Sequence, residues 1–207
     1  IKLISFLRNF IPLNSVLNHK YINKNQVSNL NVVINSLKNR GFNPDNIFDI
    51  GCFRGLWSKQ VLKIYKNSNY YLYDANIENE FFLHDLKKNY QNITYKIKLF
   101  SDDIKDYNFY KMQSGSSIFQ ENTSHARKKI TLKSSLLSDE ITSNIKKTYS
   151  NLIKIDTQGS EIKILKGLGE FIKNFEVIIL EVSVHEYNKN SPMFDEVISF
   201  LKNKNYI

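Results

Sequence analysis

The sequence predicts a fold of the α/β class, with a mostly parallel sheet, helices on both of its faces and a small β-rich insertion. Short apolar runs alternate with amphipathic helical patterns along most of the chain, which is typical of parallel sheets covered by helices. The run Glu176-Val-Ile-Ile-Leu-Glu-Val-Ser183 is almost continuously apolar, as strands buried on both faces are. The 207 residues, 42% of them hydrophobic, fit one sizeable domain.

Residues 1–40 are expected to form a helical segment that packs on the core domain, which spans residues 41–207. The first helix, over residues 1–11, would carry its apolar side chains on one face: Leu3, Phe6, Leu7, Phe10 and Ile11. Such a face packs on its own domain or, alternatively, lies in a membrane interface. No run of the sequence approaches the roughly 18 apolar residues of a membrane span.

Helices and strands then alternate along the core domain. They are expected as helix 27–37, strand 47–50, helix 57–65, strand 70–74, helix 78–90, strand 92–100, strand 152–156, helix 161–169, strand 176–183 and helix 193–201. Gly41 is expected in the position that ends the first of these helices. Residues 103–150 interrupt the alternation with short strand-like runs, so we expect a β-rich insertion that caps the site and faces the substrate.

A glycine-containing turn follows the first strand of the core, in Ile47-Phe-Asp-Ile-Gly-Cys-Phe-Arg-Gly55. Glycine is suited to a backbone that approaches a ligand closely or adopts a positive φ, and the helix after the turn presents unpaired N–H groups. Asp74 ends the next strand, about 20 residues further on, where an acid is placed to accept hydrogen bonds from the ribose hydroxyls of a nucleotide cofactor. Asp102 and Asp156 end two more of the expected strands, and the carboxyl ends of parallel strands converge on a ligand-binding crevice.

The net charge of +9 invites a nucleic-acid interpretation, but a solvated surface is favoured. Only four of the 29 basic residues are Arg, the residue that binds phosphate and base edges in a bidentate manner. Cys52 is the only cysteine, so a disulfide framework is excluded and a reducing, cytoplasmic location is expected. The four histidines show no spacing typical of a metal site, so we expect no metal.

Two motifs resemble those of a known family. Asp49-Ile-Gly-Cys-Phe-Arg-Gly55 is similar to the first motif of S-adenosylmethionine-dependent methyltransferases, and within them of the FkbM family. Lys154-Ile-Asp-Thr-Gln-Gly-Ser-Glu161 resembles the family's Lys-Ile-Asp-x-Gln-Gly-x-Glu block, and the next strand ends in Glu181 as the family's does. Ser114-Gly-Ser-Ser-Ile-Phe-Gln-Glu121 is similar to its Ser-rich segment. The resemblance implies a Rossmann-like methyltransferase fold that lacks its last strands here, so we expect a fragment.

The resemblance also implies how S-adenosyl-L-methionine is bound. Gly51, Cys52 and Gly55 would contact the cofactor through backbone groups, and Asp74 would bind the ribose. Asp49 would accept hydrogen bonds from the N–H groups of the turn or from the cofactor's ammonium group, and Asp102 would bind the adenine amino group. The sequence departs from the family at Phe53, where Asn is usual, and at Asp74, where Glu is usual.

Asp156 and Glu181 are the expected catalytic residues. By resemblance Asp156 lies nearest the transferred methyl group, as a base or acceptor-orienting group, and Gln158 and Glu161 line the same edge. Glu181 stands in an apolar strand, where a carboxylate requires a partner or a function. The expected reaction is methyl transfer to a hydroxyl oxygen of a sugar or glycan intermediate. An RNA methyltransferase and a non-catalytic binding module are the alternatives.

Overall fold

A computed structural model describes residues 3–7, 31–112, 114–124, 127–141 and 150–206. Its main sheet has six strands in the order β1-β9-β8-β2-β3-β4, and every neighbouring pair is parallel. The strands are β1 (Leu3–Leu7), β2 (Asn46–Ile50), β3 (Asn69–Asp74), β4 (Ile93–Ile97), β8 (Asn151–Ile155) and β9 (Val177–Glu181). The predicted parallel α/β fold is therefore confirmed.

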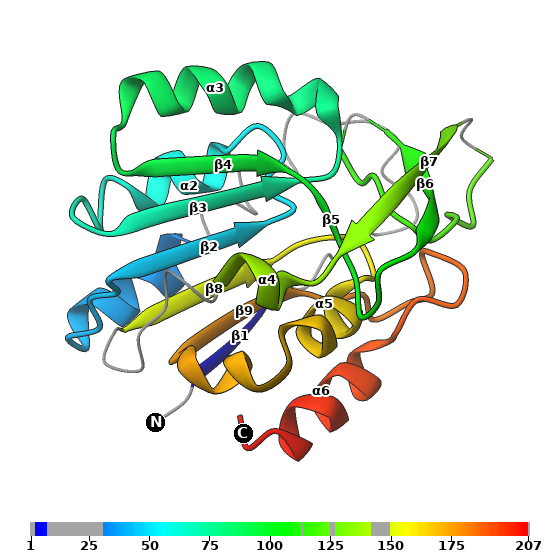
Figure 1. The fold of residues 1–207 in the computed structure, drawn as a ribbon. Coiled ribbons are helices and arrows are strands. Elements are labelled where there is room, and N and C mark those ends of the chain that lie inside the picture. Colours follow the sequence, from blue (N-terminus) through cyan, green and yellow to red (C-terminus); the bar gives the residue numbers. More distant parts are fainter. Residues whose placement is uncertain (1–2, 8–30, 113, 125–126, 142–149, 207) are drawn as a thin grey trace, which may run out of the picture.

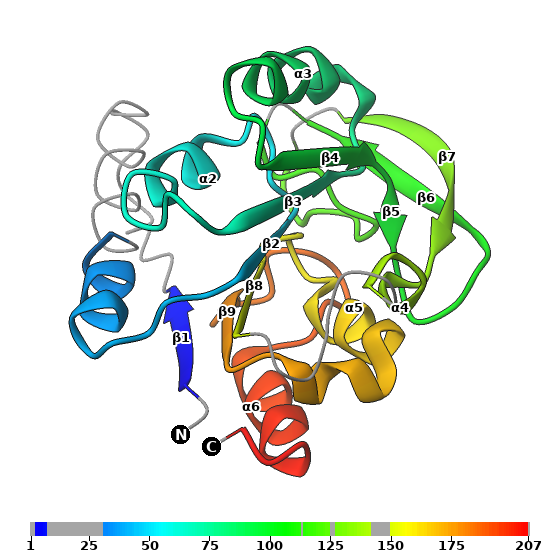
Figure 2. The same cartoon turned by 60° about the vertical axis from the view of Figure 1, so that its left-hand side comes forward.

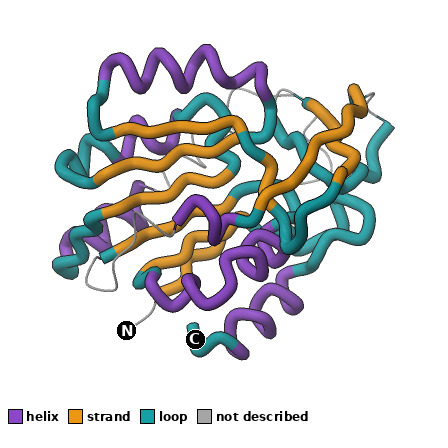
Figure 3. The backbone as a smooth tube through the Cα atoms, viewed as in Figure 1, coloured by secondary structure: helices purple, strands orange, loops and turns teal. Residues whose placement is uncertain are grey.

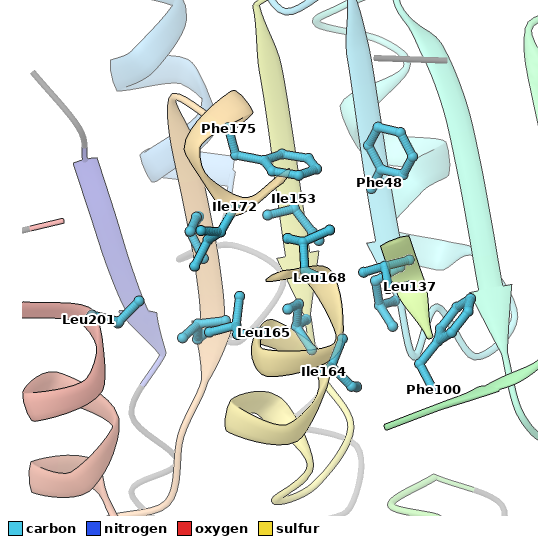
Figure 4. Close-up of a cluster of buried hydrophobic side chains, with 14 of the residues drawn as sticks. Phe48, Phe100, Leu137, Ile153, Ile164, Leu165, Leu168, Ile172, Phe175 and Leu201 are labelled. Atoms are coloured by element: carbon cyan, nitrogen blue, oxygen red, sulfur yellow. The ribbon is translucent and has the colours of Figure 1, made fainter. Parts of the chain in front are cut away.

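Helices cover both faces of this sheet (Figures 1 and 2). One face packs against the helix of residues 31–39, α2 (Leu56–Val61) and α3 (Glu80–Asn89), which η1 (Ile77–Asn79) precedes. The other face packs against α4 (Leu137–Ile141), α5 (Glu161–Leu168), η2 (Gly169–Asn174) and α6 (Phe194–Asn203). Alternation along each strand separates the two cores: Ile47 belongs to the first, and Phe48 to the second together with Ile153 and Leu165 (Figure 4).

The helix of residues 31–39 ends as expected at Gly41, which has a φ of 87°. The Gly41 N–H donates to the Lys38 carbonyl at 3.0 Å, and the Phe42 N–H donates to the Leu37 carbonyl at 3.0 Å. These bonds satisfy carbonyl groups that the end of a helix leaves without partners. The beginning of this helix, expected at residue 27, lies outside the described residues.

The prediction of an N-terminal helix is wrong over Leu3–Leu7, because these residues form strand β1 beside β9. A short apolar run is compatible with a helix and with a buried strand, and here pairing with β9 decides for the strand. The membrane-interface alternative rested on that helix, and residues 8–11 lie outside the described part. Among the described helices, none has the length and hydropathy needed to cross a membrane.

The strand expected over residues 92–100 is divided at Lys98. β4 ends at Ile97, and β5 (Leu99–Phe100) leaves the main sheet to pair in parallel with β7 (Lys128–Ser135). β7 also pairs antiparallel with β6 (Asp106–Lys111), which confirms the β-rich insertion. Asp102 therefore follows a strand of this second sheet, contrary to the expectation that it ends a strand of the main one.

The carboxyl ends of the central strands lie on the side of the molecule where the insertion stands. The arrowheads of β2, β3, β4 and β8 point toward β6 and β7 in Figure 1, and loops gather at that side in Figure 3. Ligands of open parallel sheets bind at this edge.

Candidate active site

Gly51 begins the turn after β2, with a φ of 74°. The N–H groups of Gly51 and Cys52 donate to the Tyr73 carbonyl at 2.9 and 3.0 Å. A Cβ atom on Gly51 would lie 1.9 Å from the carbonyl oxygen of Asp156, so a side chain is excluded here by the protein itself. The Asp156 N–H in turn donates to the Ile50 carbonyl at 2.9 Å. The glycine turn and the loop after β8 are therefore in direct contact.

Gly55 closes the turn and precedes α2, with a φ of 69°. A Cβ atom there would lie 2.3 Å from Cδ1 of Leu86 on α3, and the Gly55 N–H donates to the Cys52 carbonyl at 2.8 Å. The N–H groups of Gly51, Cys52 and Gly55 are therefore all bonded within the protein. Burial raises the pKa of the Cys52 thiol well above its usual value, so the thiol is uncharged.

Asp74 is fixed at the end of β3 beside this turn. One carboxylate oxygen accepts from the Phe53 N–H at 2.7 Å, and the other accepts from the Asn76 N–H at 2.8 Å and from Nδ2 of Asn79 at 2.9 Å. Burial raises the pKa of Asp74, and these three hydrogen bonds act in the opposite direction. An ionised carboxylate has about four acceptor positions, so one position, on the oxygen bound to Phe53, is left for a ligand.

Phe53 contributes to Asp74 through its backbone, so the replacement of the usual Asn does not remove this contact. Its φ is 52°, a conformation in which non-glycine residues are uncommon. The hydrogen bond from its N–H to Asp74 and the turn around it hold this conformation.

Asp49 differs from the expectation. Its side chain is fully buried below the turn, and it accepts from Oγ of Ser58 at 2.7 Å and from Nζ of Lys154 at 3.2 Å. The turn N–H groups expected to bind it donate instead to Tyr73 and Asp74. Asp49 is the register partner of Lys154 in the adjacent strand, which places both side chains on the same face of the sheet.

Lys154 is the residue of this site that the sequence interpretation missed. It stands in a strand whose five residues are all buried, and its Nζ lies 3.2 Å from Asp49 and 3.2 Å from Asp156. Burial alone would lower its pKa, but the neighbouring carboxylates of Asp156, Asp49 and Glu181 raise it, so Lys154 is charged. A lysine inside a strand of Leu and Ile indicates a buried ionic partner, and this signal was present in the sequence.

The two predicted catalytic acids are brought together above Lys154. Asp156 follows β8 and Glu181 ends the adjacent β9, and the two side chains are close enough to influence each other's protonation. Asp156 also accepts from Nε2 of Gln158 at 3.2 Å. Burial would raise the pKa of Asp156, but Lys154 and hydrogen bonding to the carboxylate outweigh it and lower the pKa. Asp156 is therefore held as a carboxylate at the edge of the sheet.

Glu161 organises the loop between β8 and α5 from inside. Its Oε1 accepts from the N–H groups of Thr157 at 3.0 Å and Gly159 at 3.2 Å, and from Oγ1 of Thr157 at 3.2 Å. Glu161 is buried rather than an exposed charge in the first helical turn, and burial raises its pKa to about 7.

The insertion contacts this loop through Gln158. Gln158 has a φ of 56°, and its carbonyl accepts from Oγ of Ser117 at 2.8 Å and from Nδ2 of Asn188 at 2.8 Å. Ser117 belongs to the Ser-rich segment, Asn188 follows β9, and a β-bridge joins Asn188 to Glu121. Three segments distant in sequence therefore meet at Gln158.

Asp102 is paired with a lysine on α5. Nζ of Lys163 on α5 donates to it at 3.0 Å, and Oγ of Ser101 at 3.0 Å. α5 covers the opposite face of the sheet from α2 and α3, the helices that flank Asp74. The carboxylate expected to bind the adenine amino group thus accepts from Lys163.

Trp57, in the first turn of α2, supplies a further polar atom. Its ring centroid lies 5.5 Å from Nζ of Lys154, and its buried Nε1 has no hydrogen-bond partner in the described part of the chain. A buried donor without a partner is rare in proteins, and it fits a site in which a ligand supplies the acceptor.

Comparison with known proteins identifies the family. Residues 34–207 match the model of the methyltransferase FkbM domain. The chain belongs to this family. The resemblance read from the two motifs is thereby confirmed, and the protein is a methyltransferase of the FkbM family. No curated protein matches the chain. Among solved structures it is similar to precorrin-6Y C5,15-methyltransferase from Geobacter metallireducens, with 12% identity and a TM-score of 0.47, over 96% of this chain and 78% of that one.

Proposed function

We propose that this FkbM methyltransferase binds S-adenosyl-L-methionine at the glycine turn and methylates a hydroxyl oxygen of a sugar or glycan intermediate. The observation that carries the proposal is the close approach of Gly51 to the backbone of Asp156, which places the half-buried carboxyl groups of Asp156 and Glu181 beside the turn. In its bound state the cofactor supplies an electrophilic methyl group on a sulfonium.

Cofactor binding is assigned to Asp74 and the glycine turn. The open acceptor position on Asp74 suits one ribose hydroxyl, rather than both as the sequence suggested. Gly51, Cys52 and Gly55 are assigned contacts with the cofactor through their backbone atoms, and the two glycines let the turn pack closely on Asp156 and Leu86. Asp49 supports this turn from below through Ser58 and Lys154, and Asp102 is assigned no direct contact.

Asp156 is assigned the role of base. As the bond from the acceptor oxygen to the methyl carbon forms and the bond from sulfur to that carbon breaks, the acceptor hydroxyl loses its proton, and Asp156 accepts it. Glu181, at the end of the adjacent strand, is assigned the role of orienting the acceptor beside Asp156. Gln158 holds the Asp156 carboxylate from the loop side, so Asp156 is fixed for an in-line approach.

Calorimetry with S-adenosyl-L-methionine tests the cofactor assignment. Asp74→Ala is expected to weaken binding by about 10- to 100-fold, because a hydrogen bond to a charged group contributes about 1.5–3 kcal/mol. Asp85→Ala, at a position on α3 whose side chain is exposed, is the matched control and should leave the affinity unchanged. Absence of binding by the unchanged protein, or equal affinity of the Asp74→Ala variant, contradicts the assignment.

The acceptor class is tested with a deuterated-methyl cofactor in cell extract. Mass spectrometry should detect the label on a sugar or glycan hydroxyl, and Asp156→Asn should abolish it. Label in the RNA fraction would favour the RNA methyltransferase that the charge of +9 suggests. Cofactor binding without any labelled product would favour a non-catalytic module.

A further inference from the structure

Lys154 joins the cofactor motif to the catalytic motif. Its Nζ lies at the same distance, 3.2 Å, from the carboxylates of Asp49 and Asp156. Asp49 is fully buried, and the Lys154 side chain is 5% exposed. Asp49 and Lys154 are 105 positions apart in the sequence of 207 residues, and the pairing of β2 with β8 brings them together.

The charges around Lys154 do not balance. Asp49, Asp156 and Glu181 are three carboxyl groups around one ammonium group. Nζ of Lys154 contacts Oδ2 of Asp156 at 3.2 Å, so the positive charge favours the ionised form of this carboxyl group.

We propose that Lys154 is a positioning residue that keeps Asp156 ionised. This inference rests on the proposed function, because it explains how Asp156 is available as a base. Lys154 needs no contact with the cofactor or the acceptor to act in this way. Asp49 acts against it, since Asp49 shares the same ammonium group.

The groups that face Asp156 come from four elements. Lys154 lies on β8, Asp49 on β2 and Glu181 on β9, and Glu161 on α5 adds a further acidic neighbour. The Gln158 amide donates to Asp156 but does not titrate. Lys154 is the cation in contact with Asp156 among the described residues, so its removal should change the pKa of Asp156 more than that of Asp74.

Carbon-13 NMR of protein labelled at the aspartate carboxyl carbons tests the inference without cofactor or acceptor. Comparison with Asp156→Asn identifies the Asp156 resonance. In Lys154→Met its titration midpoint should rise by about 1 to 3 pH units, the usual effect of a contacting opposite charge. In Asp49→Asn the midpoint should fall, because the ammonium group then faces fewer carboxylates. Ser58 retains an oxygen acceptor in that variant, so it is expected to fold.

The double variant Lys154→Met with Asp49→Asn separates a positioning role from a structural one. It removes both buried charges of the Lys154–Asp49 pair, so it should unfold at a higher temperature than Lys154→Met alone while its Asp156 midpoint stays raised. The inference is overturned if the Asp156 midpoint is unchanged in the folded variants that lack Lys154. It is also overturned if that midpoint is raised in Asp49→Asn. Failure of the calorimetric test would instead affect only the cofactor assignment, since the titration uses cofactor-free protein.

Discussion

Polar groups are buried in different ways at the two ends of the central strands. At the amino ends, Asn46, Asn69 and Asn151 are register partners on β2, β3 and β8. Nδ2 of Asn46 donates to Asn151 at 2.9 Å, Nδ2 of Asn69 donates to Asn46 at 3.3 Å, and Nδ2 of Asn151 donates to the Asn174 carbonyl at 2.8 Å. Neutral amides thus connect the strands here without any buried charge, and we call this side of the sheet the amide end.

At the carboxyl ends the same strands carry charged side chains, and we call this side of the sheet the charged end. Asp49 and Lys154 are buried and in contact, Lys154 also contacts the half-buried Asp156, and Asp74 has a pKa raised by burial. Buried charges and shifted pKa values reduce stability and gather at functional sites. The comparison indicates that one end of the sheet maintains the fold, while the other end is arranged for chemistry.

The largest effect is expected from a side chain at the glycine turn. Gly51→Ala should lower the free energy of unfolding by roughly 4 kcal/mol, since it combines an unfavourable positive φ with a clash against the Asp156 carbonyl. Gly41→Ala is the matched control: its φ is 87°, but no atom lies within 4 Å of the added Cβ, so it should cost about 1 kcal/mol. Urea unfolding of both variants measures the difference. Equal costs would show that close contact between the two motifs is not what requires glycine.

Glu161 gives the charged end a pH dependence that the amide end lacks. Its pKa rises from 4.5 to about 7 on folding, so the folded state binds the proton more tightly. The contribution of Glu161 to the free energy of unfolding is therefore highest below about pH 4.5, and it falls by about 3 kcal/mol as pH rises to 7. Glu161→Gln keeps an oxygen for the N–H groups of Thr157 and Gly159 and should remove this fall.

Urea unfolding of Glu161→Gln and the unchanged protein between pH 4.5 and 7 measures this effect. The difference between the two curves isolates Glu161 from the other acids. A constant difference over this range would contradict a buried, proton-binding Glu161.

The amide end should respond in stability alone. Asn151→Ala removes the acceptor of the buried Asn46 amide and should cost about 2 kcal/mol, within the range for an unsatisfied buried polar group. Asn69→Ala, at an exposed position with a longer hydrogen bond, should cost less than about 0.5 kcal/mol. Affinity for S-adenosyl-L-methionine, measured by calorimetry at a temperature where both variants are folded, should be unchanged. Loss of that affinity in Asn151→Ala would break the distinction between the two ends.

The sequence predicted the sheet because strand and helix periodicities are local. The prediction failed where pairing between strands distant in sequence decides the structure. Leu3–Leu7 suits a helix or a strand, and pairing with β9 makes it a strand. The main strand breaks at Lys98 because β5 pairs with β7. Neither partner can be read from the apolar pattern of the segment itself.

The same distinction applies to the site. Acids at strand ends were recognisable from sequence, and Asp156 and Glu181 stand at the ends of the adjacent strands β8 and β9. Their partners were not recognisable, because the contact of Asp49 with Lys154 depends on the register of β2 against β8. That Asp102 follows a strand of the second sheet was not recognisable either, because it depends on the pairing of β5 with β7.

The smallest effects are expected where the insertion contacts the charged end. Ser117→Ala and Asn188→Ala each remove one hydrogen bond to the Gln158 carbonyl and should each cost about 1 kcal/mol. Both bonds hold the same residue at a positive φ, so the two costs should not be additive. A double-mutant cycle by urea unfolding measures the coupling, and Ser114→Ala, at an exposed serine of the same segment, is the control.

Additive costs in that cycle would mean that the insertion and the loop after β9 contact Gln158 independently. Coupling would mean that they hold it as one unit. In that case the position of Asp156 depends on a segment outside the main sheet, because the Gln158 side chain donates to Asp156. The charged end would then be shaped by the insertion, while the amide end is maintained by the strands and the residues that adjoin them.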